Sequence, residues 1–252
     1  MASVDEANED LVSSTIEEAN NDDVVSSYTA EHLGPEFYNN ANSYWSEIPA
    51  TVDGMLGGFS HLSDNDVIES KDTILEYFVG PNARLSPDLA LDCGAGIGRV
   101  SKRLLLQIFK QVELVEQNPI FLKKAKSYLK AYKQRVIAYH AVGLQDFYPE
   151  PDRYSIIWCQ WVLAHLTDKD MMEFLDRSRI ALQHKGLIVA KENVVKEVEE
   201  RLFHKDDSSQ TRSCKVFKEL FAKAGLKLLK EVKQGNFPPG MLEIRTFVLA
   251  FD

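Results

Sequence analysis

Leu91-Asp92-Cys93-Gly94-Ala95-Gly96-Ile97-Gly98-Arg99 is the most informative stretch of this 252-residue chain. The apolar run that ends at Leu91 predicts a buried strand, and apolar residues at helical spacing from Val100 to Ile108 predict a helix. The three glycines therefore lie in a turn between a strand and a helix, where the backbone bends sharply and a ligand can approach closely. This arrangement favours a nucleoside-bearing ligand, although a tight turn that binds nothing has the same pattern.

The spacing of the glycines distinguishes two kinds of nucleoside site. A dinucleotide-binding turn has the pattern Gly-x-Gly-x-x-Gly, but the third glycine here comes one residue too early. Asp92 also precedes Gly94 by two positions, and its carboxylate would repel a pyrophosphate but attract a cationic amino-acid group. The pattern Asp-x-Gly-x-Gly-x-Gly resembles motif I of the class I S-adenosylmethionine (AdoMet) methyltransferases.

An acid at the end of the next strand supports a nucleoside site. Val112–Glu116 alternates as a strand does, and Glu116 lies 24 residues after Asp92. Folds of this kind place a ribose-binding carboxylate at a spacing of roughly 20 residues, because a carboxylate there accepts hydrogen bonds from both ribose hydroxyls. A solvated Glu at a strand end is the alternative. The motif and the acid together predict a nucleoside-binding βαβ unit.

Strand and helix patterns alternate along the rest of the chain, which predicts a parallel sheet with right-handed crossovers. A turn at Asn236–Gly240 adds one antiparallel strand. We therefore predict an α/β fold of the class I methyltransferase (Rossmann-like) type. Its seven-stranded, mostly parallel sheet has helices on both faces, an N-terminal helical cap, and an inserted loop or hairpin after the fifth strand. The predicted strands cover residues 88–92, 112–116, 136–140, 154–160, 186–192, 226–233 and 242–251; the predicted helices cover 66–78, 99–110, 119–132, 168–183 and 213–224.

Charge divides the chain into two parts. Residues 1–70 contain 15 acids and no Lys or Arg, whereas the net charge of the whole chain is −9. Residues 1–34 are predicted to form a disordered acidic tail, since few apolar residues accompany the acids. Residues 35–252 are predicted to form the methyltransferase domain, with the aromatic-rich segment 35–80 as its cap.

Several kinds of function are disfavoured by composition. The three cysteines have no metal-ligand spacing, so we expect no metal site and a reduced intracellular compartment. No apolar run reaches the length of a membrane span, and no signal peptide is evident. Direct nucleic-acid binding is not indicated, because no Lys/Arg run is interleaved with aromatic residues. We expect a cytoplasmic or nuclear location, or both.

Polar and aromatic residues follow the third and fourth predicted strands. In this fold Leu144 and Gln145 would lie against an adenine ring, with a solvated turn as the alternative. Gln160 and Trp161 leave the fourth strand at the place where a methyltransferase holds its acceptor. His165 would act as a general base or hold the acceptor amine, and Trp161 would wall the pocket or contact a cation. Ordinary structural roles for both residues remain open.

The polar stretch Asn193–Thr211 follows the fifth predicted strand. Spacing alone favours a solvated loop in which Asp207 or Ser208 caps the next helix. The alternative is an acidic rim over the active site.

A longer block points to one family. The segment Tyr44-Trp45-Ser46-Glu47-Ile48-Pro49-Ala50-Thr51-Val52-Asp53-Gly54-Met55-Leu56-Gly57-Gly58 resembles the N-terminal segment of the protein α-N-terminal methyltransferases. That family's version of motif I is similar to Leu91–Arg99, and further matches extend the resemblance over about residues 40–250. They are Gly143–Phe147, Trp158–Trp161 with His165, Lys191–Asn193 and Asp207–Ser209.

The resemblance implies a role for each matching residue. Arg99 would bind the methionine carboxylate of AdoMet, because Arg can grip a carboxylate with two parallel hydrogen bonds. Asp207 would position the substrate amine, and His165 together with Asp207 would accept its proton. The expected sets are Asp92, Gly94, Gly96, Gly98, Arg99, Glu116, Leu144, Gln145 and Gln160 for the cofactor; Trp45, Met55, Trp161, Asn193, Asp207 and Ser209 for the substrate; and Asp207, His165 and Asn193 for catalysis.

The implied substrates are proteins that begin X-Pro-Lys or X-Pro-Arg after loss of the initiator Met, with ribosomal or chromatin-associated proteins as expected partners. Two positions depart from the family pattern. His204 stands where an acid is common, and Leu242 stands where a Tyr is common, so Asp206 is a candidate replacement in gripping the third substrate residue. Two other interpretations stay open: a class I methyltransferase for another protein site or a small amine, and an AdoMet-binding protein without catalysis.

Overall fold

The computed structural model describes residues 30–251, so most of the predicted acidic tail lies outside the described residues. Helix α2 (Ala30–Leu33) nevertheless belongs to the folded part. Ala30 is buried, and its N–H donates to the side chain of Gln210 over 2.9 Å. The prediction of disorder is therefore wrong for the residues of α2, because their partner lies 180 positions away in the sequence.

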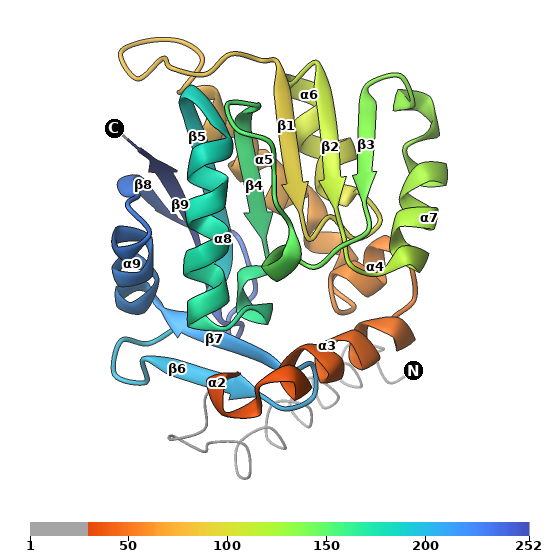
Figure 1. The fold of residues 1–252 in the computed structure, drawn as a ribbon, viewed down its shortest axis with the longest axis vertical. Coiled ribbons are helices and arrows are strands. Elements are labelled where there is room, and N and C mark those ends of the chain that lie inside the picture. Colours follow the sequence, from red (N-terminus) through yellow and green to blue (C-terminus); the bar gives the residue numbers. More distant parts are fainter. Residues whose placement is uncertain (1–29, 252) are drawn as a thin grey trace, which may run out of the picture.

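A sheet of nine strands organises the fold (Figure 1). Its parallel part has the order β3-β2-β1-β4-β5, and β9 then pairs antiparallel with both β5 and β8. The predicted fold class is confirmed, and the two strands beyond the predicted seven come from the insertion after β5. The strands are β1 (Leu89–Cys93), β2 (Gln111–Val115), β3 (Val136–His140), β4 (Tyr154–Gln160), β5 (Leu182–Val195), β6 (Arg201–His204), β7 (Ser209–Ser213), β8 (Lys227–Lys233) and β9 (Glu243–Ala250).

Helices cover both faces of the sheet, because successive strand residues point to opposite sides. Leu91 on β1 packs into one apolar core with Phe174 and Phe217, whereas its neighbour Ala90 packs into a second core with Ile74 and Leu122. Helices α8 and α9 therefore cover one face, and α5, α6 and α7 cover the other (Figure 1). These elements are α5 (Ser63–Leu75), η3 (Ser101–Leu105), α6 (Leu106–Ile108), α7 (Pro119–Tyr128), η4 (Lys130–Tyr132), α8 (Asp168–Ala181) and α9 (Cys214–Lys223).

The N-terminal cap lies at the carboxyl ends of the parallel strands, where open α/β sheets bind their ligands (Figure 1). It consists of α2, α3 (Pro35–Glu47), α4 (Val52–Met55), η2 (Ser60–Leu62) and the start of α5. The cap packs on the insertion after β5, since the Ser208 hydroxyl donates to the Phe37 carbonyl over 2.9 Å. Two segments far apart in the sequence thus meet at the same edge of the sheet.

The insertion after β5 is a hairpin rather than a solvated loop. β6 and β7 pair antiparallel, and the end of β7 pairs with the end of β5. The residue that caps α9 is Ser213, whose hydroxyl accepts from the N–H of Val216, so the prediction of Asp207 or Ser208 as the cap is wrong. The prediction failed because β7 is entirely polar and yet buried, a combination that looks like a loop.

In the part of the chain that the structure describes, no helix is long and apolar enough to cross a membrane. The same described residues contain no cluster of His, Cys, Asp or Glu that could hold a metal ion.

Candidate active site

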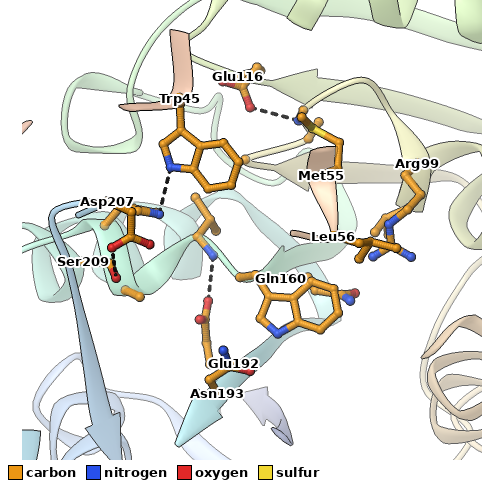
Figure 2. A pocket seen from close by; sticks show the side chains of 18 of the residues that line it. Trp45, Met55, Leu56, Arg99, Glu116, Gln160, Glu192, Asn193, Asp207 and Ser209 are labelled. Atoms are coloured by element: carbon orange, nitrogen blue, oxygen red, sulfur yellow. Dashed lines mark hydrogen bonds between the residues drawn. The ribbon is translucent and has the colours of Figure 1, made fainter. Parts of the chain in front are cut away.

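A cavity of about 560 Å³ lies between the cap, the carboxyl ends of the parallel strands and the β6–β7 hairpin. Figure 2 shows Arg99 and Met55 on one side of it and Asp207 and Ser209 on the other. The predicted site residues all line this cavity except Gly98. Residues from segments more than 100 positions apart in the sequence are therefore brought to one place.

The glycine turn is shaped for close approach. Gly94 and Gly96 both have positive φ, 64° and 54°, which L side chains rarely adopt. A Cβ on Gly94 would lie 2.4 Å from Val162, and a Cβ on Gly96 would lie 2.5 Å from the Met55 sulfur. The turn is thus a cradle that only glycine can line, and Met55 covers it from the cap.

Gly98 packs against a helix end. It is not among the residues that line the cavity, and a Cβ there would lie 2.8 Å from Leu129, at the end of α7. Its φ of 82° and its close packing explain the glycine without any ligand. Its contact with the cofactor therefore stays a prediction, because the motif does not separate glycines that face a ligand from those that face another helix.

Asp92 is buried at the end of β1. Its Oδ2 accepts from the Ser101 N–H over 2.9 Å and from the Ser101 hydroxyl over 2.6 Å. Burial raises its pKa to about 6, although the Ser101 hydrogen bonds oppose this shift. Asp92 therefore anchors the helix after the glycine turn as well as lining the cavity.

Glu116 is tied to the same turn. Its Oε2 accepts from the Gly96 N–H over 2.9 Å, and its Oε1 accepts from the Asn118 N–H over 2.8 Å. Burial raises the pKa of this carboxyl, and the backbone hydrogen bonds act against that shift. Because each carboxylate oxygen has two lone pairs, the orientation that these bonds impose leaves capacity for two ribose hydroxyls.

Arg99 and Gln160 share an anchor that the sequence did not indicate. Asp66, on α5 of the cap, pairs with Arg99 over 2.7 Å and with Lys191 over 2.5 Å. Its two carboxylate oxygens also accept from the Gln160 amide over 2.9 and 3.0 Å. Burial opposes ionisation of Asp66, but Lys191 and Arg99 outweigh it and lower the pKa of this carboxyl.

The loop after β3 is held in place by Arg177 of α8. This loop contains the short helix η5 (Leu144–Asp146), which carries both residues predicted to meet the adenine. The Arg177 guanidinium donates to the carbonyls of Leu144 and Gln145 over 3.0 Å and to that of Phe147 over 2.9 Å. Leu144 is buried, so the loop is a fixed part of the cavity wall rather than a solvated turn.

The turn that carries His165 is held by side-chain hydrogen bonds to its backbone N–H and carbonyl groups. It forms η6 (Leu163–His165), directly after β4. Glu192 accepts from the N–H groups of Val162 and Leu163 over 2.9 and 2.8 Å. Arg212, buried on β7, donates to the carbonyls of Leu163 and Leu166 over 3.2 and 2.7 Å. Burial raises the pKa of Glu192 to about 7 against the effect of its two backbone bonds.

His165 itself is bonded to the cap. The Trp45 indole N–H donates to its Nε2 over 3.1 Å, so the neutral ring carries its proton on Nδ1. Burial lowers the pKa of His165, whereas the Asp207 carboxylate and the Ser208 backbone act in the opposite direction. Asp207 accepts from the Ser209 hydroxyl over 2.7 Å, which orients one of its oxygens.

Comparisons with known proteins agree with this geometry. Residues 34–250 match the family of AdoMet-dependent proline di-methyltransferases. The chain belongs to this family. It is an AdoMet-dependent methyltransferase, and the resemblance to protein α-N-terminal methyltransferases is confirmed.

Relatives of this methyltransferase share most of its length. It is 45% identical to the human N-terminal Xaa-Pro-Lys N-methyltransferase 1 over 216 residues, which cover 85% of this chain and 95% of the relative. The Danio rerio protein of the same name is 44% identical over 214 residues, or 84% and 95% of the two chains. A solved SAM-dependent methyltransferase from Leishmania major is 32% identical with a TM-score of 0.80, covering 88% of this chain and 87% of that one.

More distant structures share the fold alone. A Burkholderia thailandensis 1,6-didemethyltoxoflavin-N1-methyltransferase has a TM-score of 0.67 at 17% identity, covering 91% of this chain and 94% of that one.

The cavity of this methyltransferase has features that suit AdoMet. The Gly94–Gly96 cradle leaves room that any side chain would fill. The indole Nε1 of Trp161 is buried and has no hydrogen-bond partner among residues 30–251, although it belongs to a residue that lines the cavity. Trp161 also has a positive φ of 53°, and the Arg99 guanidinium lies 5.6 Å from its ring centroid. A strained backbone and an unpaired donor at such a wall are typical of a ligand site.

The mouth of the cavity is acidic and includes the two positions already named, His204 and Leu242. His204 hydrogen-bonds the Thr211 hydroxyl over 3.0 Å, and Leu242 is 38% exposed. Asp206 and Asp207 both line the cavity. Burial raises the pKa of nearby Tyr44, and both carboxylates add to that shift. The mouth thus presents negative charge beside an apolar wall.

Proposed function

We propose that this methyltransferase modifies the α-amino group of proteins that begin Xaa-Pro-Lys or Xaa-Pro-Arg after removal of the initiator Met. The relatives, which are N-terminal Xaa-Pro-Lys N-methyltransferases, support this substrate class. The observation that carries the proposal is the contact between Trp45 of the cap and His165 of η6, with Asp207 beside them. This group lines the same cavity as the cofactor cradle.

Within the proposed site, Gly94, Gly96 and Glu116 hold the ribose end of AdoMet, and Arg99 with Gln160 holds its methionine end. Asp92 lies between these groups, near the amino-acid moiety. Leu144 packs on the adenine, and Gln145 meets its polar edge. AdoMet supplies a methyl group that its positively charged sulfur already activates. The chain must therefore mainly align the attacking nitrogen and manage its proton.

The amine must be neutral to attack. A free α-amino group has a pKa of about 7.7–8.0, so part of it is neutral at cellular pH. In our proposal Asp207, oriented by Ser209, draws the amine into place, and Asn193 at the end of β5 holds the peptide backbone. Asp207 alone would favour the charged amine, so a second group is needed to accept the proton.

His165 accepts that proton, together with Asp207. The acceptor atom is Nε2, because the neutral ring carries its hydrogen on Nδ1. In the structure, Nε2 already accepts a hydrogen bond from the Trp45 indole N–H. The proposal therefore requires the Trp45 indole to release Nε2 when the peptide enters the channel.

Two features suit the second and third substrate residues. A Pro ring packs well on the indoles of Trp45 and Trp161, and Pro has no N–H to leave unpaired in an apolar channel. A Lys or Arg at position three would meet Asp206 at the mouth, where His204 and Leu242 replace the residues common in the family. Ribosomal or chromatin-associated proteins with such N-termini, in the cytoplasm or nucleus, are the substrates to test first.

A peptide panel tests the proposal. Peptides that begin Ser-Pro-Lys and Ala-Pro-Lys should be methylated, and replacement of Pro by Gln or of Lys by Glu should lower kcat/KM by about tenfold or more. A peptide with an acetylated α-amine is the control and should not react. If AdoMet binds but no Xaa-Pro-Lys peptide is methylated, the proposal is wrong, and the chain either acts on another amine or binds AdoMet without catalysis.

A further inference from the structure

Asp66 joins the cap to the methionine end of the proposed cofactor site. The carboxylate is 1% exposed and contacts three side chains from three other elements: Arg99 after β1, Gln160 at the end of β4 and Lys191 on β5. Lys191 is fully buried and also donates to the Ser70 hydroxyl over 2.9 Å and to the Asp66 carbonyl over 3.2 Å. The start of α5 is thereby bound to β4, to β5 and to the segment that follows β1.

Asp66 is the carboxylate that pairs directly with both buried basic side chains of this cluster, Arg99 and Lys191. Burial lowers the pKa of Lys191, and the Glu69 carboxylate opposes that shift. The Asp92 carboxylate adds an electrostatic attraction to Arg99. Buried charges are stable only when paired, so an additional anion beside Arg99 would complete the cluster. The carboxylate of an amino-acid ligand supplies such an anion at a point that lines the cavity.

Asp66 also limits how Arg99 and Gln160 can point. Only Nη1 of Arg99 is used in the bond to Asp66, so the planar guanidinium keeps other donors in a fixed direction. Gln160 is fixed at both ends, because its amide donates to Asp66 and its carbonyl accepts from the Trp158 indole over 3.0 Å. A side chain whose partners are fixed loses less entropy when it binds a ligand.

We propose that Asp66 is a positioning residue for the amino-acid end of AdoMet. It holds Arg99 so that the free donors of the guanidinium face the methionine moiety, it fixes the Gln160 side chain beside that moiety, and it does not touch the adenosine. The proposal rests on the proposed cofactor roles of Arg99 and Gln160. It makes the strength of cofactor binding depend on the docking of the start of α5, which belongs to the cap.

The nucleoside end has a separate support, which provides an internal contrast. Arg177 holds the carbonyls of Leu144 and Gln145 from the opposite face of the sheet. Its hydrogen bonds all go to the loop after β3, and its guanidinium lies 4.6 Å from the Tyr148 ring centroid, away from the Asp66 cluster. Loss of Arg177 should therefore weaken every ligand that contains adenosine, whereas loss of Asp66 should weaken only ligands that carry the amino-acid end.

Calorimetric titration with two ligands tests this difference. S-adenosylhomocysteine and 5′-methylthioadenosine share adenosine and sulfur, but only the first has the amino-acid end. We expect Asp66→Asn to weaken S-adenosylhomocysteine binding by about tenfold or more, and to change methylthioadenosine binding by less than about twofold. Arg177→Met, the matched contrast, should weaken both ligands by similar factors.

A second variant separates positioning from folding. Asp66→Asn leaves both Lys191 and Arg99 without their carboxylate partner, which destabilises the fold. Asp66→Asn/Lys191→Met also removes the Lys191 charge, so only Arg99, which lines the cavity, loses its ion pair. The double variant should unfold at a higher Tm than Asp66→Asn and still lose S-adenosylhomocysteine affinity selectively.

Two results would overturn the inference. The first is an S-adenosylhomocysteine affinity that is unchanged in both Asp66 variants. The second is an equal loss of affinity for S-adenosylhomocysteine and for methylthioadenosine in both variants. Arg99→Ala distinguishes this failure from failure of the proposed site. If Arg99→Ala weakens S-adenosylhomocysteine binding while the Asp66 variants do not, only the role of Asp66 is wrong. If Arg99→Ala also leaves the affinity unchanged, the proposed placement of the methionine end is wrong.

Discussion

Trp45 donates its indole N–H to Nε2 of His165 over 3.1 Å, and this bond joins helix α3 of the cap to the turn after β4. The bond places the lone pair of the neutral imidazole against the cap. It also sets the rings at 82° to each other with centroids 5.7 Å apart. The protonation of His165 is therefore coupled to the position of the residue that walls the proposed peptide channel.

Replacement of Trp45 by Phe should raise the pKa of His165. The indole N–H donates a hydrogen bond that favours the neutral ring, and burial also favours the neutral ring. Loss of this hydrogen bond removes one of the two effects that lower the pKa of His165. We expect a rise of up to about one unit, measured by NMR titration of the His165 ring protons. A pKa that is the same in the wild type and in Trp45→Phe would show that the bond does not control the protonation of His165.

Asp207→Asn should lower kcat by about a hundredfold, because Asp207 is proposed to place the amine and to share its proton. The affinity for S-adenosylhomocysteine should stay within about twofold of wild type, since Asp207 lies on the hairpin and not on the cofactor cradle. Asp206→Asn is the matched control on the same turn. It should raise KM for an Xaa-Pro-Lys peptide several-fold and leave kcat nearly unchanged. If the two variants behaved alike, the mouth would act only through its overall charge.

Glu192 should make the stability of the fold depend on pH. Its pKa is about 7 in the folded protein, against 4.5 for an ordinary Glu. At a pH between these two pKa values, Glu192 holds more protons in the folded state than in the unfolded state. The contribution of Glu192 to stability therefore falls as the pH rises through this range. Glu192→Gln can still accept from the Val162 and Leu163 N–H groups but does not titrate.

The Tm of Glu192→Gln relative to wild type should therefore increase from pH 5 to pH 8. Differential scanning calorimetry at the two pH values measures this change. If the Tm of Glu192→Gln differs from the wild-type Tm by the same amount at pH 5 and at pH 8, Glu192 does not titrate between these pH values.

Gly96→Ala and Gly98→Ala should fail in different ways, although both residues belong to the same motif. Both have positive φ, so each substitution should cost about 1–2 kcal/mol of stability. Only the Cβ at position 96 enters the cavity, where it meets Met55. Gly96→Ala should therefore also weaken S-adenosylhomocysteine binding, whereas Gly98→Ala should bind it normally at temperatures where the protein is folded. Calorimetric titration beside thermal unfolding separates these effects.

The fold and the cofactor end of the site were largely predictable from the sequence. Strand and helix periodicity is a local property, and the glycine turn and Glu116 lie at the ends of adjacent strands, where topology brings them together. The same logic predicted the positions of Gln160 and His165. The packing of Gly98 against Leu129 was not predictable, because a close ligand contact and a close helix contact both require glycine.

The residues that hold the site together could not be found in this way. The side-chain partners of Asp66 in this cluster lie 33 or more positions away in the sequence. The carbonyls that Arg177 bonds lie 30 or more positions away. Neither residue belongs to a local sequence pattern. Arg212 lies on a buried strand whose polar composition is typical of a loop. These contacts arise only when the hairpin and the cap pack against the strand ends, so they depend on tertiary structure rather than on propensity.

The most direct test of the central claim is to locate the transferred methyl group. A peptide that begins Ala-Pro-Lys, incubated with the enzyme and AdoMet, is fragmented by tandem mass spectrometry so that the α-nitrogen and the Lys side chain are distinguished. We predict that all added methyl groups lie on the α-nitrogen of Ala and that Asp207→Asn largely abolishes them. Methylation of the Lys ε-amine with an unmodified α-nitrogen would contradict the account.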